Sequence, residues 1–188
     1  MLSVYRIRAA HQDDFEGIAK VRVDTWRVAY KGIVPDGFLD GLSYQNIAGR
    51  WREVFWEEKS PGMAVFVAEN EREEIVGIAV CGPEQSQDPV YRGEIYILYV
   101  LPQYQRQGIG HALVAACVRH LVQQLAVEKL LIWTIAESPY RRFYESLGGK
   151  VVRETIKEIG GKMIPEVGFG WEEIHSLQKS LTGATTQP

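Results

Sequence analysis

The stretch Val100-Leu101-Pro102-Gln103-Tyr104-Gln105-Arg106-Gln107-Gly108-Ile109-Gly110 decides the fold, because a strand ends in it and a helix begins. Residues 94–100 are aromatic and β-branched, which is typical of a central strand. The residues after the stretch show a helical apolar stripe of Ile109, Ala112, Leu113, Ala116, Cys117, His120 and Leu121. The first N–H groups of a helix have no intrahelical partner, and the helix dipole adds about half a positive charge there. The junction is therefore a candidate anion site.

Three kinds of phosphate-binding loop compete for this junction. Gly108 and Gly110 carry no side chains, so a diphosphate can approach the backbone amides. A nucleotide-hydrolysing P-loop requires Gly-Lys-Ser/Thr, whereas His111 and Ala112 follow Gly110. A dinucleotide-binding loop requires a third glycine where Leu113 stands. Neither of these two loops fits the sequence.

The third pattern, Gln/Arg-x-x-Gly-x-Gly after a Val-x-Pro strand exit, resembles the coenzyme A diphosphate loop of the GNAT superfamily of acyl-CoA-dependent N-acetyltransferases. A second motif, Phe143-Tyr144-Glu145-Ser146-Leu147-Gly148, is similar to a segment that the superfamily carries after a later strand. The order of predicted elements also matches, over residues 4–171. One position departs from the pattern, since Glu137 and Ser138 stand where a similar bacterial branch often has Asn.

Hydrophobic periodicity predicts the element order β-α-α-β-β-β-α-β-α-β-β. The predicted strands cover residues 4–10, 63–69, 75–81, 94–100, 129–135, 150–158 and 164–171. The predicted helices cover 15–30, 44–59, 109–121 and 139–147, with Ser43 and Ser138 as N-caps and an exposed loop at 31–42. We expect an α/β fold with a mixed sheet, in which the resemblance implies splayed central strands. One domain at residues 1–174 and a flexible tail at 175–188 are expected.

Composition excludes several classes of function. The 188 residues are 46% hydrophobic and 24% charged, with a net charge of -3 and a pI of about 5.9, so nucleic acid is not an expected partner. No apolar run reaches the ~18 residues of a membrane span and no signal peptide is recognisable, so we expect a cytoplasmic protein without a membrane partner. The four histidines are scattered, which predicts no metal site, and Cys81 and Cys117 are expected to be buried, reduced thiols.

The resemblance implies acetyl-CoA as the acyl donor and a set of residues that bind it. The pantetheine arm would lie along residues 98–100, where a backbone N–H near Tyr99 or Val100 would meet the thioester carbonyl. The turn at residues 105–110 and His111 would hold the diphosphate, with Arg106 and Arg141 adding charge. The implied donor-binding residues are Leu98, Tyr99, Val100, Gln105, Arg106, Gln107, Gly108, Ile109, Gly110, His111, Ser138 and Arg141.

Two residues are catalytic candidates by the same resemblance. Tyr144 stands where the superfamily has a general acid for the departing thiolate, although Tyr140, Phe143, Tyr144 and Leu147 also form a helical stripe typical of core. Glu94 stands where some members have a glutamate that deprotonates the acceptor amine through water. Trp26, Tyr30 and Tyr96, together with Phe38, are candidates to line the acceptor pocket, and Glu69 or Glu166 would attract a cation.

The leading hypothesis is therefore acetyl transfer from acetyl-CoA to a primary amine by direct attack in a ternary complex. The acceptor would be a small-molecule amine or a peptide N-terminus. Superfamily members often pair, so the resemblance makes a homodimer one option, whereas the sequence leaves the oligomeric state open. One alternative is a non-catalytic module that binds or senses acyl-CoA. Another is an unrelated nucleotide-binding α/β protein.

Overall fold

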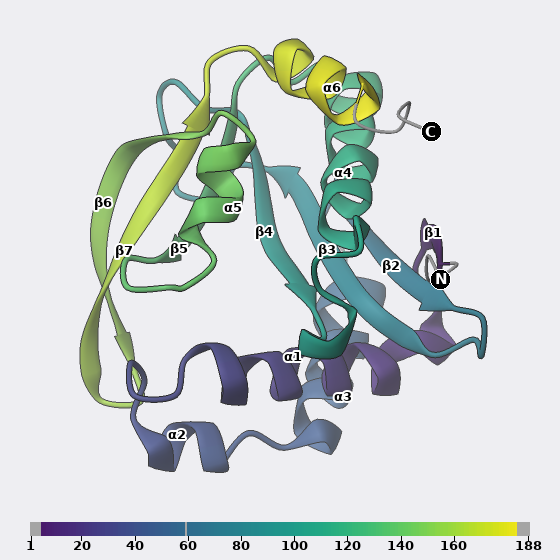
Figure 1. Cartoon of the computed structure of the whole chain (residues 1–188), viewed down its shortest axis with the longest axis vertical. Coiled ribbons are helices and arrows are strands. Elements are labelled where there is room, and N and C mark those ends of the chain that lie inside the picture. The colour runs from purple at the N-terminus through teal and green to yellow at the C-terminus, as the bar shows by residue number, and fades with distance from the viewer. Residues whose placement is uncertain (1–4, 59, 184–188) are drawn as a thin grey trace.

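Seven strands form one mixed sheet, as the sequence predicts (Figure 1). The computed structural model describes residues 5–58 and 60–183. The spatial order is β1-β2-β3-β4-β5-β7-β6, and every neighbouring pair is antiparallel except β4 and β5. The strands are β1 (Tyr5–Ala9), β2 (Ala64–Asn70), β3 (Ile75–Pro83), β4 (Gly93–Val100), β5 (Leu130–Ile135), β6 (Lys150–Ile159) and β7 (Lys162–Trp171).

The parallel strands β4 and β5 separate after three residues, which confirms the expected splay. Their pairing runs from Gly93↔Leu130 to Ile95↔Ile132, whereas β4 stays paired with β3 as far as Val100. Between Ile95 and Ile97 the register with β3 shifts, so Tyr96 is an extra residue in β4. The end of β4 therefore has one paired edge and one open edge.

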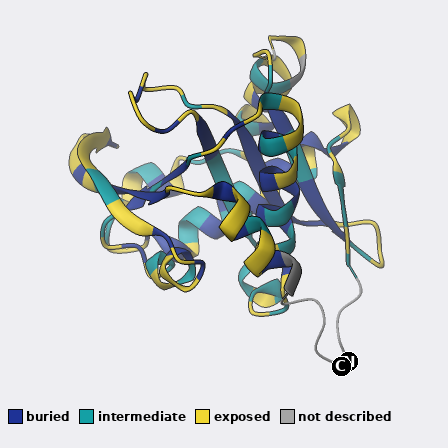
Figure 2. Cartoon of the chain, turned by 90° about the horizontal axis from the view of Figure 1, so that it is seen from above, coloured by how far each residue is buried: buried dark blue, intermediate teal, exposed yellow. Residues whose placement is uncertain are grey.

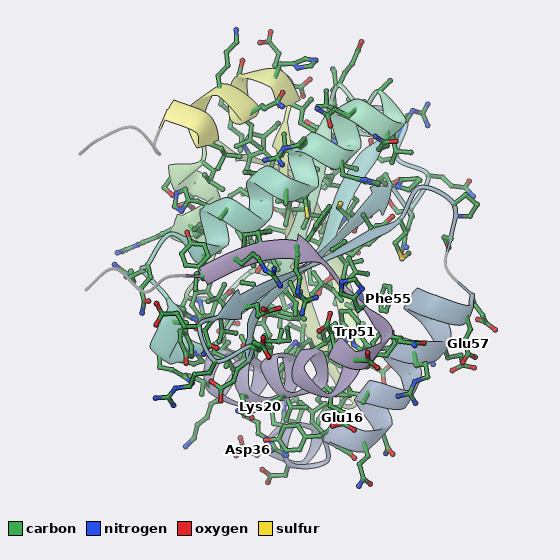
Figure 3. All side chains as sticks on the ribbon, turned by 90° about the vertical axis from the view of Figure 1, so that its right-hand side faces the viewer. Glu16, Lys20, Asp36, Trp51, Phe55 and Glu57 are labelled. Atoms are coloured by element: carbon green, nitrogen blue, oxygen red, sulfur yellow. The ribbon has the colours of Figure 1, made fainter. Side chains whose placement is uncertain are left out.

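Helices cover both faces of the sheet. In Figure 3, α1 (Phe15–Ala29) and α3 (Tyr44–Arg52) lie on one side of the strands, and α4 (Ile109–Leu125) lies on the other. The stripe predicted on α4 is buried against the sheet through Ile109, Leu113 and Leu121. Figure 2 shows the central strands as the dark blue, buried layer of the molecule. Short helical turns occupy Gln12–Asp14, Glu53–Glu57 and Pro102–Tyr104.

The structure corrects two expectations about helices. The loop expected at 31–42 contains the short helix α2 (Asp36–Asp40), because Pro35 precedes its first turn and Leu39 is buried in a small core cluster beneath it. The tail expected from residue 175 contains α6 (Ile174–Gly183), which packs on α4. Ile174, Leu177 and Leu181 are buried there. This apolar stripe keeps α6 packed on α4, although the residues at the end of the chain are small and polar. Residues 184–188, and Val4 of the first predicted strand, lie outside the described residues.

No helix in the described part of the chain is long and apolar enough to cross a bilayer. Cys81 and Cys117 are free and buried, as expected.

Candidate functional site

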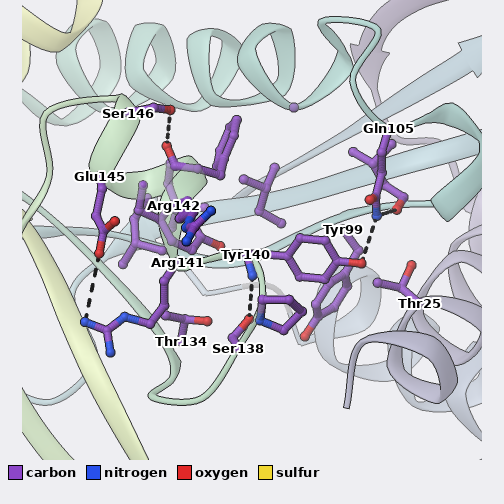
Figure 4. Close-up of a pocket in the computed structure, with 18 of the residues that line it drawn as sticks. Thr25, Tyr99, Gln105, Thr134, Ser138, Tyr140, Arg141, Arg142, Glu145 and Ser146 are labelled. Atoms are coloured by element: carbon purple, nitrogen blue, oxygen red, sulfur yellow. Dashed lines mark hydrogen bonds and ion pairs between the residues drawn. The ribbon is translucent and has the colours of Figure 1, made fainter. Parts of the chain in front are cut away.

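A cleft of about 1190 Å³ opens where β4 and β5 separate. Its walls come from the end of β4, the turn before α4, β5, and α5 (Arg141–Ser146) with the loop before it (Figure 4). Thr25 of α1 and Tyr30, which follows that helix, close the end opposite α5. The volume exceeds the ~300–1,000 Å³ of ordinary small-molecule pockets, so the cleft can hold a long ligand.

The open edge of β4 presents the backbone of Leu98 and Val100. The amide of Leu101 donates to the carbonyl of Val76 in β3, and hydrogen bonding alternates along an antiparallel pair. The N–H of Tyr99 therefore faces β3, and those of Leu98 and Val100 face the cleft. Of the two amides expected near the thioester, Val100 is available and Tyr99 is paired within the sheet.

The turn before α4 is shaped to expose backbone amides. Arg106 has a φ of 61° and Gly108 a φ of 85°, so two left-handed residues bracket Gln107 and Gly108 serves as the N-cap of α4. Alternating backbone conformations of this kind make an anion-binding concavity, and the free N–H groups of the helix N-terminus add to it. A non-glycine residue at positive φ is strained, and such strain is common at ligand-binding turns.

The residues predicted to bind the diphosphate divide into those that line the cleft and those that do not. Gln105, Arg106, Gly108, Gly110 and His111 line the cleft. Ile109 is buried in the core, and Gln107 donates to the carbonyl of Gln103, so these two can offer only their backbone.

The arginines of α5 differ in their availability. Arg141 donates to the carbonyl of Ala136 at 3.0 Å and its guanidinium lies over the ring of Phe169, so its side chain is already engaged. Arg142, which also lines the cleft, is exposed and makes no ion pair with a described residue. With Arg106 and His111 it gives the cleft a basic rim.

Ser138 is not the N-cap of α5, contrary to the prediction. Its hydroxyl accepts from the amide of Tyr140 at 3.3 Å, which makes a local turn, and the helix begins at Arg141. The turn directs Tyr140 across the cleft, where its hydroxyl accepts from the Gln105 amide nitrogen at 3.1 Å. Gln105 also donates to the carbonyl of Val100, so it connects the end of β4 to the start of α5 (Figure 4).

Tyr144 lies in the wall of the cleft, and its ring is part of the core. The side chain is only 7% exposed and packs against Phe143 and Phe169. Burial raises the pKa of its hydroxyl. It is therefore protonated at neutral pH. Because the hydroxyl makes no hydrogen bond with a described residue, it is free to donate to a ligand.

Glu94 lies at the start of β4, where it is buried and outside the lining of the cleft. Its carboxylate accepts from the amide of Gln85 at 3.2 Å. Burial raises the pKa of Glu94 to about 7, and the negative charges of Glu84 and Glu166 act in the same direction. A carboxylate with this pKa is suited to act as a base near neutral pH.

The aromatic residues predicted for the acceptor do not all reach the cleft. Tyr30 and Tyr96 line it, and the Tyr96 hydroxyl donates to the carbonyl of Pro83. Trp26 stacks edge-on against Tyr30 at 4.9 Å and packs near Phe38, outside the lining. Its place as an acceptor residue stays a prediction.

Of the two carboxylates considered for a cation, Glu69 is already neutralised, because it forms ion pairs with Arg6 and Arg8. Glu166 has no ion pair with a described residue, and burial raises its pKa. No group of three metal-ligating side chains occurs among residues 5–58 and 60–183.

Sequence reasoning missed Thr25. Thr25 interrupts an apolar helix face between Val21 and Ala29, which is the only signal that it carries. The sequence offers Arg141 and Arg142 equally as candidates to reach the coenzyme phosphates, since both lie in the first turns of the same helix, and only the contacts of Arg141 distinguish them.

We expect replacement of Gly108 with Ala to weaken coenzyme A binding at least tenfold. A left-handed conformation costs a non-glycine residue about 1–2 kcal/mol, and the new Cβ would lie 3.1 Å from the Tyr5 hydroxyl. Calorimetric titration with coenzyme A measures the effect. Gly49→Ala, on an open face of α3, is the matched control and should leave binding unchanged. Equal affinities for Gly108→Ala and wild type would contradict the role of this turn.

Known proteins resemble this chain in sequence and in fold. The model of the acetyltransferase (GNAT) family matches residues 26–149. The uncharacterized N-acetyltransferase YuaI of Bacillus subtilis (strain 168) is 35% identical over 175 residues, which is 93% of this chain and 97% of that protein. The yncA structure from Salmonella typhimurium, with its cofactor acetyl-CoA, is similar with a TM-score of 0.65 and 20% identity, covering 92% of this chain and 95% of that one. A mutant of the spermidine N-acetyltransferase SpeG from Vibrio cholerae has a TM-score of 0.64 and 15% identity, covering 94% of this chain and 98% of that one. The chain belongs to the acetyltransferase (GNAT) family.

Proposed function

We propose that the protein transfers the acetyl group of acetyl-CoA to a primary amine by direct attack in a ternary complex. The observation that carries this is that the open edge of β4, the turn before α4 and Tyr144 all line one cleft. These residues fit acetyl-CoA. The free amides of the turn can bind its diphosphate, and the unpaired edge of β4 can form hydrogen bonds with the amides of its pantetheine arm. Acetyl-CoA is also the cofactor in the similar yncA structure.

The donor end of the cleft binds and orients acetyl-CoA. The amides at Gly108, Ile109 and Gly110 hold the diphosphate, with Arg106, Arg142 and His111 around it. Leu98 pairs with the pantetheine arm through its free backbone groups, and Val100 offers only its N–H, because its carbonyl already accepts from Gln105. The N–H of Val100 stabilises the oxygen that gains negative charge as the amine attacks the thioester carbon.

Two protons must move during the reaction. The attacking amine must be neutral, and a primary amine has a pKa near 10 in water, so it has to lose a proton. Glu94 accepts that proton through water, because its carboxylate lies outside the cleft lining. The nitrogen–carbon bond forms as the carbon–sulfur bond breaks, and Tyr144 donates a proton to the sulfur. The second proton that the nitrogen loses as the amide forms restores the proton of Tyr144.

A covalent acyl-enzyme is not part of this proposal. Neither Cys81 nor Cys117 lines the cleft, and both thiols are buried. Burial raises the pKa of Cys117, which opposes thiolate formation. Direct attack needs no such nucleophile, only correct placement of the two substrates.

The test is release of free thiol from acetyl-CoA in the presence of a panel of primary amines, after calorimetry has established acetyl-CoA binding. We expect amine-dependent release. Tight binding of acetyl-CoA without release by any amine would support a non-catalytic sensor instead. Stabilisation by ATP or NAD, with none by acetyl-CoA, would overturn the assignment of the cleft.

A further inference from the structure

Thr25 places a polar atom without a partner at the wall of the cleft. Its side chain is 3% exposed, and its hydroxyl oxygen makes no hydrogen bond with a described residue. The residue lines the cleft on the α1 side, opposite α5 (Figure 4). A buried hydroxyl without a partner destabilises the folded protein, so its retention at this wall indicates a partner on a ligand.

Arg22 lies one turn earlier on the same face of α1. Its guanidinium lies over the ring of Trp26, with 5.5 Å to the centroid. The buried Nε has no hydrogen-bond partner, and the side chain forms no ion pair with a described residue. By contrast, Arg8 of β1 forms ion pairs with Asp14 and Glu69. Arg22 thus presents positive charge beside Thr25 that the described protein does not neutralise.

A carboxylate lies on the other side of the same region. Glu166 in β7 pairs in register with Ile135, beyond the point where β4 leaves β5, and it has no ion pair with a described residue. The hydroxyl of Tyr99, a residue that lines the cleft, lies within the electrostatic reach of both Arg22 and Glu166. Neither Arg22 nor Glu166 is among the residues that line the cleft, so the cation and the carboxylate lie behind its wall, near Tyr99.

We propose that the acceptor is a zwitterion of the amino-acid type, whose carboxylate binds Arg22 and Thr25 and whose amine faces the Glu166 side. This inference rests on the proposed acetyl transfer and names the substrate class at the acceptor end of the same cleft. The Arg22 guanidinium and the Thr25 hydroxyl both donate hydrogen bonds, and a carboxylate oxygen accepts from both.

The charge arrangement disfavours the other common class of small amine. A polyamine would bring a second cation close to Arg22, where like charges repel and Thr25 would stay unsatisfied. Glu166 alone would suit a polyamine, so Arg22 and Thr25 are the residues that separate the two classes.

The first experiment measures kcat/KM for thiol release with the twenty L-amino acids, their carboxamides and spermidine as acceptors. Each carboxamide keeps the side chain of its acid but lacks the negative charge and carries an NH2 donor in place of one acceptor oxygen. We expect at least one acid to react about ten- to a hundred-fold faster than its carboxamide and faster than spermidine, since a charge-assisted hydrogen bond contributes a difference of this size.

The second experiment tests the two residues with the fastest acid. Arg22→Gln and Thr25→Val should each reduce kcat/KM for the acid about tenfold or more and leave that for the carboxamide within about threefold. Arg119→Gln, an exposed arginine on α4, is the control and should change neither value. Calorimetric titration of the acid against the enzyme loaded with coenzyme A should show the same loss of affinity. Thr25→Val removes a buried unsatisfied hydroxyl, so its Tm should not fall.

The outcomes separate this inference from the proposed function. Equal or faster turnover of the carboxamides or of spermidine overturns the zwitterion while leaving acetyl transfer intact. Loss of activity toward acid and carboxamide alike in both variants also overturns it, because the residues would then act in folding or catalysis. Failure of every amine in the panel to release thiol counts against acetyl transfer itself, and the inference falls with it.

Discussion

Replacing Tyr144 with Phe is expected to lower kcat about ten- to a thousand-fold, with coenzyme A affinity nearly unchanged. The ring is packed against Phe143 and Phe169, and Phe preserves those contacts. The hydroxyl has no partner among the described residues, so its loss breaks no internal hydrogen bond. The cost falls on the departing thiolate, which then has no proton donor. Steady-state kinetics and calorimetric titration with coenzyme A measure the two quantities.

A second buried tyrosine provides the control for this variant. Tyr91 is also buried, but it donates to Glu172 at 2.6 Å, away from the cleft. Tyr91→Phe should lower Tm because it removes an existing hydrogen bond to a carboxylate, and it should leave kcat unchanged. A Tyr144→Phe enzyme with wild-type kcat would remove the general acid from the mechanism.

Replacing Glu94 with Gln is expected to abolish the rise of activity around pH 7. Because the pKa of Glu94 is raised to about 7, the carboxylate loses its proton and becomes a base as the pH passes that value. The wild-type profile of kcat/KM against pH should bend there, and the acceptor amine contributes its own ionisation at higher pH. In Glu94→Gln the bend near pH 7 should disappear while the amine limb remains. At pH 8 we expect a loss of about 10²–10⁴-fold.

The stability of the same variant tests the environment of Glu94 independently of catalysis. Because the pKa of Glu94 is raised in the folded state, the protonated carboxyl makes its full contribution to the free energy of unfolding at low pH. That contribution is lost as the pH rises through 7. Gln carries no charge, so Glu94→Gln should melt at the wild-type temperature near pH 4.5 and at a higher temperature at pH 8. A lower Tm at pH 8 would mean that the carboxylate is stabilised by contacts that its burial does not suggest.

The fold was predictable from sequence because its strongest signals are local. The apolar stripe of α4 and the β-branched run of β4 each follow one period, and the glycine-containing turn joins them. The missed helices show the limit of this approach. α6 is short, and its three apolar residues can be recognised as a buried face only when their packing against α4 is known. Ser138 has the residue type of an N-cap, but its hydroxyl accepts from an amide before the helix starts.

The site was less predictable than the fold, because its decisive features are absences of contact. The sequence names Arg22 and Thr25 only as polar residues on a helix, and it cannot show that their polar atoms have no partner among the described residues. It likewise cannot distinguish Leu98 from Tyr99, since which backbone edge is free depends on register with β3. Tyr144 could be proposed because its motif is contiguous in sequence.

In the proposed complex, the pantetheine arm of the coenzyme would extend the sheet at the half-paired end of β4. The amides of Leu98 and Val100 have no partner on the β5 side, so water solvates them when the cleft is empty. Bound pantetheine would cover these amides, while the amide of Tyr99 stays bonded to β3 in either state. Deuterium uptake at residues 98 and 100 should therefore slow when coenzyme A is added, and uptake at residue 99 should not. Amide exchange at these two backbone positions would thus measure how much of the enzyme has coenzyme bound, without any substituted residue or attached label.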